Sequence, residues 1–285
     1  MQIRTMTVRD IPAGMRLKEI AGWNQTEADW QIFLDASRDG CFVAEVDGVV
    51  RGTATTIVYG GRLAWVGMVL VHPQDRGHGI GTTLLKKCIE HLDSIQVPCI
   101  KLDATPLGKP IYEKLGFATE YELERWSLER RKDELPRREQ LVPSESMPGP
   151  LPEDVLKADR EAFGADRGAV LRALNRNQPL FTDFVWNAGS TEGYAFGRRG
   201  SFADHLGPWM AKDEAAGERI LMRFLAHSRR EMVVTDCSKA NRFARKLLQA
   251  RGFEYSRPLT RMFRGRNAYP GRPELVCAIL GPEFG

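Results

Sequence analysis

The feature that most constrains this chain is a glycine-rich turn between an apolar run and an amphipathic segment. Residues 63–71 form the apolar run, which predicts a buried strand. Apolar residues recur every three or four positions from Leu84 to Leu92, which predicts a helix that begins at the glycines. This arrangement favours binding of an anion, because backbone N–H groups and the helix dipole converge on one concavity.

The spacing of the glycines narrows the choice of phosphate-bearing ligand. Gly77, Gly79 and Gly81 lack a Cβ, so a phosphate can approach the backbone closely. The turn does not end in Gly-Lys-Ser/Thr, which excludes a Walker-type nucleotide site. Its Gly-x-Gly-x-Gly spacing also differs from the Gly-x-Gly-x-x-Gly pattern of dinucleotide-binding folds.

Two ordered motifs resemble the signatures of the GNAT (GCN5-related) N-acetyltransferase superfamily. The family's pyrophosphate loop, Gln/Arg-x-x-Gly-x-Gly/Ala, is similar to Arg76-Gly77-His78-Gly79-Ile80-Gly81. Its second signature, Leu-Tyr-Glu-Lys-Leu-Gly-Phe, is similar to Ile111-Tyr112-Glu113-Lys114-Leu115-Gly116-Phe117. Two signatures in the right order are far more specific than a glycine-rich loop alone.

This resemblance implies a co-substrate and the residues that bind it. Acetyl-CoA would place its pyrophosphate on the loop, and the end of the apolar strand would give a backbone N–H to the thioester carbonyl. No metal is expected. The implied cofactor-binding residues are Val69, Leu70, Val71, Arg76, Gly77, His78, Gly79, Ile80, Gly81 and Thr82.

The composition of the chain limits the classes of protein to which it can belong. The chain has 285 residues, 42% of them apolar and 27% charged, which allows two globular domains. It has no apolar run of membrane-spanning length and no secretory leader at its start, so we expect a cytoplasmic protein without a membrane partner. Five scattered cysteines predict reduced core residues. The net charge is only +4 and no basic stripe appears, so no nucleic-acid partner is expected.

The predicted elements as far as residue 128 follow the order βααβββαβαββ, which matches the GNAT topology of a mixed sheet with helices on both faces. A proline-rich stretch follows, and the second half of the chain then repeats the first faintly. The resemblance therefore implies an α/β fold class with a mixed sheet, in two tandem GNAT (acyl-CoA N-acyltransferase) folds. We expect an acetyl-CoA-binding N-terminal domain over 1–130, a linker over 131–152 and a divergent C-terminal domain over 153–285.

The second repeat is not expected to bind CoA in the ordinary way. Its loop, predicted over residues 204–213, has one glycine where the first repeat has three. Pro208 contributes no N–H, and Trp209 would fill space that a phosphate needs. Leu248 stands where the first repeat has Tyr112. This repeat is expected either to shape the acceptor site or to act as structural support.

Acetyl transfer to an amine requires a proton donor for the leaving thiolate and a base for the amine. Tyr112 matches a tyrosine that acts as general acid in many family members, although it could instead pack its helix on the sheet. A phenol with a pKa of about 10 can protonate a thiolate with a pKa of about 8–9. Many relatives use a glutamate on the fourth strand as base, but residues 63–71 include no carboxylate. Asp103 is the catalytic candidate here; Glu45 or a water chain are alternatives.

Candidate acceptor residues come from both repeats. Trp23, Asn24 and Gln25 lie between the first two predicted helices, where the family usually lines its acceptor site; their alternative role is packing at a helix end. The second repeat offers Trp186, Asp204 and Asp236, with His205 beside them.

The expected function is transfer of an acetyl group from acetyl-CoA to an amine of a small-molecule acceptor, by a monomer or homodimer. One alternative is an acyltransferase that uses another acyl-CoA. Another is a non-catalytic acetyl-CoA sensor. The missing carboxylate on the fourth strand favours the sensor, whereas Tyr112 favours an enzyme.

Overall fold

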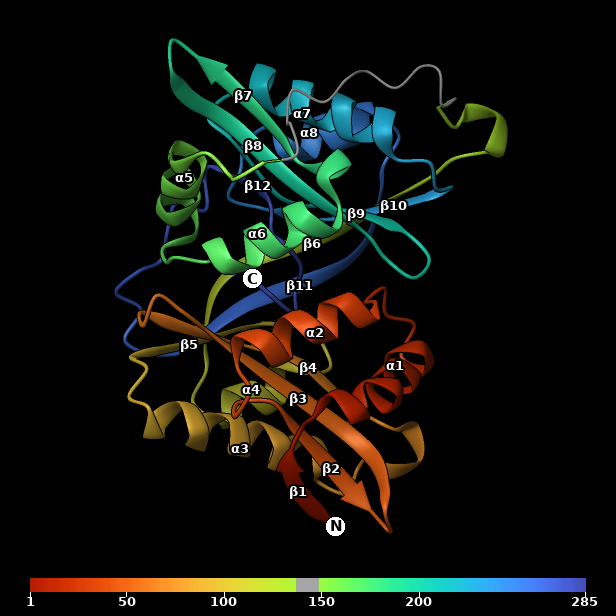
Figure 1. Ribbon diagram of the computed structural model, residues 1–285, viewed down its shortest axis with the longest axis vertical. Helices are drawn as coiled ribbons and strands as arrows, with labels where there is room; N and C mark the ends of the chain where they lie inside the picture. The colour runs from red at the N-terminus through yellow and green to blue at the C-terminus, as the bar shows by residue number, and fades with distance from the viewer. Residues whose placement is uncertain (137–148) are drawn as a thin grey trace. The chain divides into compact units, whose positions relative to one another are not determined.

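The computed structural model describes residues 1–136 and 149–285, which divide into two compact units (Figure 1). The first unit comprises Met1–Glu120, Arg261–Ala268 and Glu283–Gly285, and the second comprises Tyr121–Thr260 and Tyr269–Pro282. The expected domains over 1–130 and 153–285 follow the sequence repeats, whereas the compact units exchange segments between the repeats. Residues 137–148 of the expected linker lie outside the described residues.

The first unit is built on a mixed sheet in the order β1-β2-β3-β4-β5, which confirms the predicted class. Strands β1 to β4 pair antiparallel, and β4 pairs parallel with β5. The end of β11 (Glu254–Gly265) continues this sheet beside β5, from Arg261 onwards. The bounds are β1 Gln2–Thr5, β2 Phe42–Val46, β3 Val49–Tyr59, β4 Leu63–Val71 and β5 Cys99–Ala104.

Helices cover both faces of this sheet. Figure 1 shows α1 (Ile11–Ile20) and α2 (Glu27–Ala36) on one face and α3 (Ile80–Ser94) on the other. A short α4 (Lys109–Lys114) follows β5. The apolar stripe of α3 packs on alanine and valine side chains of β2, β3 and β4; the residues of this stripe are Leu84, Leu85, Cys88, Ile89 and Leu92.

Strands β4 and β5 pair only near their starts. The parallel register places Ala64 opposite Ile100 and Trp65 opposite Lys101, and no later pair of these strands is described. Because β4 continues as far as Val71, its second half runs on without β5 beside it. A ligand can therefore reach the backbone of β4 from this side.

A bulge in β4 marks the point of separation. Thr53 lies opposite Leu70 and Thr55 opposite Gly67, so two residues of β4 face one residue of β3. Met68, inside the bulge, has a φ of 50°. Such a bulge bends a strand and redirects its backbone groups, and bulges are common beside active sites.

Arg261 enters the first unit from the second sequence repeat and pairs with Asp103 of β5. Its Nε and Nη2 donate to the two carboxylate oxygens at 2.9 Å each. The two side chains are 5% and 0% exposed. The guanidinium also lies 4.5 Å from the centroid of the Trp65 ring. This pair joins strands that are distant in sequence.

Removal of the guanidinium should destabilise the first unit strongly. In an Arg261→Ala variant Asp103 would remain buried without this cation, which costs about 3–5 kcal/mol of unfolding free energy. Urea denaturation followed by tryptophan fluorescence measures the change. The control is Arg272→Ala, whose ion pairs with Glu161 and Glu274 are exposed and should matter little. Equal effects of the two substitutions would contradict a structural role for the buried pair.

The second unit has a sheet in the order β6-β10-β12-β9-β8-β7, with β9 also parallel to β10. Its first strand, β6 (Ala118–Glu129), comes from the first sequence repeat and pairs antiparallel with β10, with Trp126 opposite Thr235. The other strands are β7 Asp183–Asn187, β8 Ser190–Arg199, β9 Asp204–Ala211, β10 Met232–Ser238 and β12 Val276–Ala278. The helices are α5 Glu153–Phe163, α6 Gly168–Asn177, α7 Glu214–His227 and α8 Ala244–Ala250.

The predicted loop over residues 204–213 is wrong. Residues Asp204–Ala211 form β9, which is buried along its whole length. Proline is unusual within a central strand, so Pro208 favours a loop when the sequence is considered alone. A Cβ on Gly207 would lie 1.9 Å from the carbonyl oxygen of Ile279, so close packing requires this glycine. Trp209 belongs to the hydrophobic core of the unit and is fully buried.

Candidate active site

A cavity of about 390 Å³ opens in the first unit between β4, the glycine-rich turn and helices α3 and α4. Eight of the ten expected cofactor-binding residues line it: Val69, Val71, Arg76, Gly77, Gly79, Ile80, Gly81 and Thr82. Leu70 is buried beside the cavity and His78 is exposed in the turn; neither contributes to the lining. Three lining residues were missed, namely Asp75, Leu85 and Ile111. Asp75 and Ile111 are adjacent in sequence to the expected residues Arg76 and Tyr112, and this adjacency could have identified them.

The turn presents a helix N-terminus to the cavity. Gly77 and Gly79 have φ values of 83° and 80°, which other residues rarely adopt. Gly79 caps α3, whose first turn has no acidic residue and no side-chain cap. The first N–H groups of a helix have no acceptor within the helix. They are therefore donors for an anion, and a Cβ at either glycine would meet nothing within 4 Å.

The charges around the turn favour an anion as well. Arg76 donates from Nε to the carbonyl oxygen of Val71 at 3.1 Å, which fixes the base of its guanidinium at the end of β4. Asp75 is the acidic residue of the lining, and it lies 3.7 Å from Arg51 and 3.6 Å from Nδ1 of His72. Arg51 offsets the negative charge of Asp75. The positive charges of Arg76 and of the helix dipole therefore dominate the electrostatic potential at the turn.

Tyr112 lines the side of the cavity formed by α4. Its ring lies over Gly108, so that a Cβ on Gly108 would lie 2.9 Å from Cε2 of Tyr112. The ring also meets the ring of Phe117 edge-on, with the two centroids 6.1 Å apart. Burial raises the pKa of Tyr112 to about 12. No hydrogen bond from its hydroxyl to another described residue is present. Tyr112 therefore packs its helix, lines the cavity and keeps its hydroxyl protonated near neutral pH.

The other candidates of the first unit lie away from this cavity. Both oxygens of Asp103 are occupied by Arg261, so the structure does not support Asp103 as a base. Asn24 and Gln25 are 6% and 7% exposed, whereas Trp23 is half-buried. Glu45 accepts from Arg4 at 2.9 Å.

Of the candidate acceptor residues in the second unit, Asp204 and Asp236 form ion pairs, and Trp186 lies on the strand at the edge of the sheet. Asp236 is fully buried and accepts from Arg125 at 2.8 and 2.7 Å. Burial acts to raise the pKa of Asp236, but the Arg125 pair outweighs it and lowers the pKa. Burial raises the pKa of Asp204, which accepts from Ser228 at 2.9 Å. Trp186 is 38% exposed on β7. Asp204 and Asp236 thus have clear structural partners.

The second unit lacks a counterpart of the glycine-rich turn. Only Lys212 and Asp213 connect β9 to α7, and Asp213 caps the helix by accepting from the backbone N–H of Ala216 at 2.8 Å. A carboxylate thus occupies the place of a phosphate at this N-terminus.

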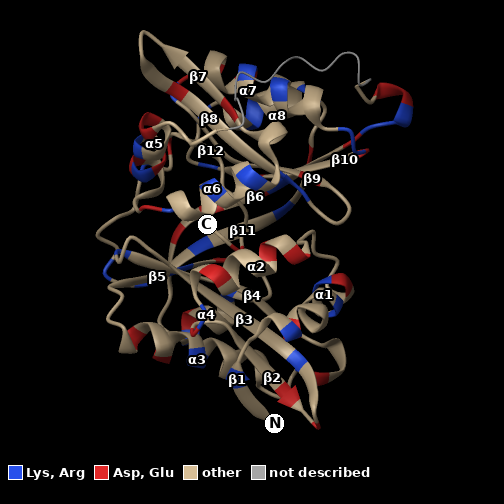
Figure 2. Ribbon diagram, viewed as in Figure 1, with Lys and Arg blue, Asp and Glu red and all other residues tan. Residues whose placement is uncertain are grey.

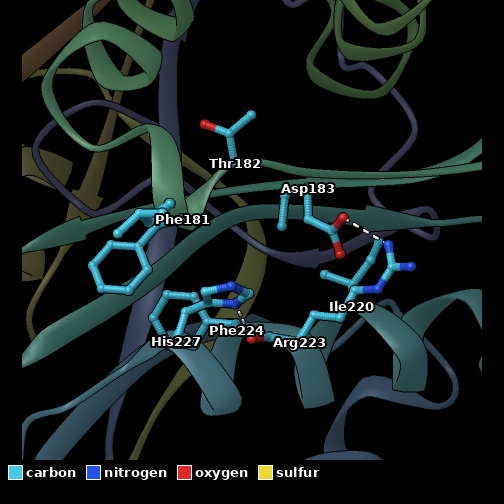
Figure 3. Close-up of a pocket in the computed structure, with 9 residues that line it drawn as sticks. Phe181, Thr182, Asp183, Ile220, Arg223, Phe224 and His227 are labelled. Carbon is cyan, nitrogen blue, oxygen red and sulfur yellow. Dashed lines mark hydrogen bonds and ion pairs between the residues drawn. The ribbon is translucent and has the colours of Figure 1, made fainter. Parts of the chain in front are cut away.

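A cavity of the second unit, shown in Figure 3, lies beside the later part of α7. Phe181, Phe224 and His227 line it, and Arg223 donates to Asp183 across it at 2.8 Å. Its volume of about 10 Å³ holds roughly one water molecule. This cavity is too small for a nucleotide cofactor.

Basic and acidic residues are interspersed over the helices and strands (Figure 2). Within residues 1–136 and 149–285, no three His, Cys, Asp or Glu side chains gather in a way that could hold a metal ion. In the same residues, no helix combines the length and the apolar character needed to cross a bilayer.

Comparison with known families identifies both repeats. Residues 12–117 match the model of the acetyltransferase (GNAT) family, and residues 155–278 match that of an acetyltransferase (GNAT) domain. The chain therefore belongs to the GNAT acetyltransferase superfamily and carries two of its domains in tandem. This confirms the two GNAT folds expected from the sequence, and it defines the class as acyltransferase.

Individual relatives agree with this family. The uncharacterized N-acetyltransferase YitH of Bacillus subtilis (strain 168) is 31% identical over 114 residues, which are 40% of this chain and 39% of that protein. A solved structure from Pyrococcus horikoshii, assigned as an acetyltransferase, has a TM-score of 0.83 at 24% identity and covers 100% of this chain and 95% of that one. A GCN5-related N-acetyltransferase from Sphaerobacter thermophilus has a TM-score of 0.64 at 16% identity, covering 95% and 96%. The two structural likenesses establish the fold.

Proposed function

We propose that the first unit binds acetyl-CoA in the cavity beside α3 and transfers the acetyl group to an amine of a small molecule. The observation that carries this proposal is the uncapped N-terminus of α3, which opens on a cavity that Tyr112 also lines. An anion site and a proton donor thus share one cavity of a GNAT domain.

The residues of the cavity fit the two ends of the co-substrate. Backbone N–H groups at the start of α3 would donate to the pyrophosphate, with Arg76 beside them. The second half of β4 has no described pairing with β5, so a backbone N–H near Val69 can donate to a carbonyl oxygen. Acetyl-CoA supplies the activated thioester carbonyl, and Tyr112 provides the proton that the departing thiolate takes.

For the acceptor, we propose the segment between α1 and α2, with Trp23, Asn24 and Gln25. The role we propose for the second unit is structural, because Asp236 pairs with Arg125 and Asp204 accepts a hydrogen bond from Ser228. We also propose a cytoplasmic location and a monomer or homodimer. The five cysteines are buried free thiols, as expected of reduced core residues.

A non-catalytic acetyl-CoA sensor is the second candidate. It is favoured by one observation: β4 and its bulge contain no carboxylate to accept a proton from an amine. Use of a different acyl-CoA is a variant of the first proposal, since the cavity lining described above recognises the CoA part.

Calorimetric titration of acetyl-CoA tests the proposal first. We expect one site per chain, because only the first unit retains the glycine-rich turn. Two sites would contradict our interpretation of the second unit, and no binding would contradict the proposed co-substrate. An amine screen that measures CoA release then separates enzyme from sensor. The buried cysteines should contribute little background to a thiol reagent.

A further inference from the structure

A second sizeable cavity, here called the arginine cavity, lies in the second unit. Its volume is about 370 Å³, and its lining residues are Arg199, Arg229 and Arg230. Arg199 is the last residue of β8, whereas Arg229 and Arg230 lie between α7 and β10. Guanidinium groups around one cavity repel one another, and an anion between them would replace this repulsion with attraction.

A buried carboxylate holds two of these side chains in place. Asp204, the first residue of β9, is fully buried, and its Oδ1 lies 3.7 Å from Nε of Arg199 and 3.5 Å from Nε of Arg230. Arg230 also donates from Nη1 to the carbonyl oxygen of Ser201 at 3.2 Å. One carboxylate is thus shared between two guanidinium groups. It can offset only part of their positive charge, and the burial that raises the pKa of Asp204 reduces this offset further.

The arginines of the cavity are not needed to cap the end of α7. The C-terminus of a helix carries partial negative charge, which attracts cations. Arg130 already serves this purpose, because it donates to the carbonyl oxygens of Leu225 at 3.2 Å, Ser228 at 3.0 Å and Arg230 at 2.7 Å. The helix end is therefore satisfied by a residue that does not line the cavity.

The lining side chains keep donors that a ligand can use. An arginine side chain carries five N–H donors in a planar fork. Arg229 is exposed and forms no hydrogen bond or ion pair with another described residue. Arg199 has the ion pair with Asp204 and no hydrogen bond to the rest of the described chain. Phosphate oxygens match this fork closely, because two parallel N–H groups can donate to one phosphoryl group.

We propose that the arginine cavity binds the phosphoryl or pyrophosphoryl group of a small molecule. This site does not depend on the proposed acetyltransferase function. It follows the C-terminal end of α7, whereas the first unit is proposed to hold pyrophosphate at the N-terminal end of the corresponding helix, α3. The described lining has no apolar side chain to contact a pantetheine chain, so the expectation of one acetyl-CoA site per chain stands.

The distribution of charge favours a small ligand over a nucleic acid. A nucleic acid is bound along a continuous track of cations, because its phosphates repeat along the strand. In Figure 2, basic and acidic residues are interspersed over the helices and strands, and the net charge of the chain is only +4. The arginine cavity is therefore a local concentration of positive charge, sized for one or two phosphoryl groups.

Calorimetric titration of inorganic pyrophosphate tests the site. The protein is a Gly81→Asp variant, so that the turn before α3 does not contribute, and the salt concentration is about 0.15 M to screen weak surface binding. We expect one site per chain. Adding Arg229→Glu should weaken binding on the order of 100-fold, because a donor is lost and a like charge faces the ligand. Arg229 has no described partner, so the fold should persist, and thermal denaturation verifies this.

Arg242→Glu, added to the same Gly81→Asp protein, is the matched control. Arg242 is exposed in the second unit, and its neighbour Phe243 packs on Gly217 near the start of α7, at the other end of this helix from the cavity. The substitution changes the net charge equally but should leave pyrophosphate binding unchanged.

Three results would overturn the inference. The first is a folded Gly81→Asp protein that binds no pyrophosphate. The second is an equal effect of Arg229→Glu and Arg242→Glu, which would indicate general attraction to the whole chain. The third comes from a competition with a single-stranded RNA oligonucleotide. If the RNA displaces pyrophosphate and binds far more tightly, the ligand is a nucleic acid and not a small molecule.

Discussion

A Gly81→Asp variant should lose acetyl-CoA binding while it retains its fold. Gly81 does not have a positive φ, and a Cβ there would lie at an ordinary 3.4 Å from Cγ2 of Val71. An acidic residue in the first turn stabilises a helix, so folding is not the cause of any defect. The carboxylate would instead repel the pyrophosphate, and we expect the affinity to fall on the order of 100-fold or more. Calorimetry measures the binding, and thermal denaturation checks the fold.

Gly48→Asp is the control for this experiment. Gly48 lies in the turn between β2 and β3, where a Cβ would meet nothing within 4 Å. Its φ of 77° strains a side chain, so thermal denaturation checks the fold of this variant as well. This variant adds the same charge to the first unit but should bind acetyl-CoA like the wild type. If Gly81→Asp also binds normally, the pyrophosphate does not lie at the N-terminus of α3.

Tyr112→Phe should lower kcat by about 100- to 1000-fold and leave the affinity for acetyl-CoA unchanged. The ring would still pack on Gly108 and Phe117, so only the proton donor is lost. Because burial raises the pKa of Tyr112 to about 12, the wild-type hydroxyl remains protonated at any pH well below that value. The wild-type rate should therefore show no loss from Tyr112 ionisation between pH 6 and about 10. Steady-state kinetics across this range tests both expectations.

Tyr255→Phe is a suitable control, since Tyr255 is 51% exposed on β11 and lies in the second unit. It should have no effect on turnover. Full activity of Tyr112→Phe would assign Tyr112 to packing alone, and the proton donor would have to be sought elsewhere.

The sequence predicts local structure well wherever interactions between residues close in the chain decide that structure. The glycine-rich turn and the helix after it follow from backbone conformation and apolar spacing. Thr26 followed three residues later by Asp29 is the pattern of a capping box, and it forms at the start of α2, with the N–H of Thr26 donating to Asp29 at 2.7 Å. The Asp47-Gly48 turn joins β2 to β3 for the same reason, as both residues adopt positive φ. Such contacts are encoded within a few residues.

Contacts between distant segments were not predictable in this way. Asp103 had the features of a catalytic base in the sequence because its partner, Arg261, is 158 residues away. Glu283 lies on Gly67 through packing that no periodicity encodes. The sequence predicts a loop where β9 lies because Gly207 and Pro208 are poor strand formers, yet close packing on Ile279 selects the glycine. Tertiary packing decided each of these positions.

The exchange of segments between the repeats has a consequence for biosynthesis. A ribosome that has finished the first repeat has not yet made Arg261 or Glu283, so the nascent first unit lacks the partner of Asp103 and the cover over Gly67. The unit expected to carry the active site is therefore the last to be completed. Severing the chain between the repeats would likewise separate each sheet from a strand that it needs, so these domains cannot be treated as modules that are inherited or expressed one at a time.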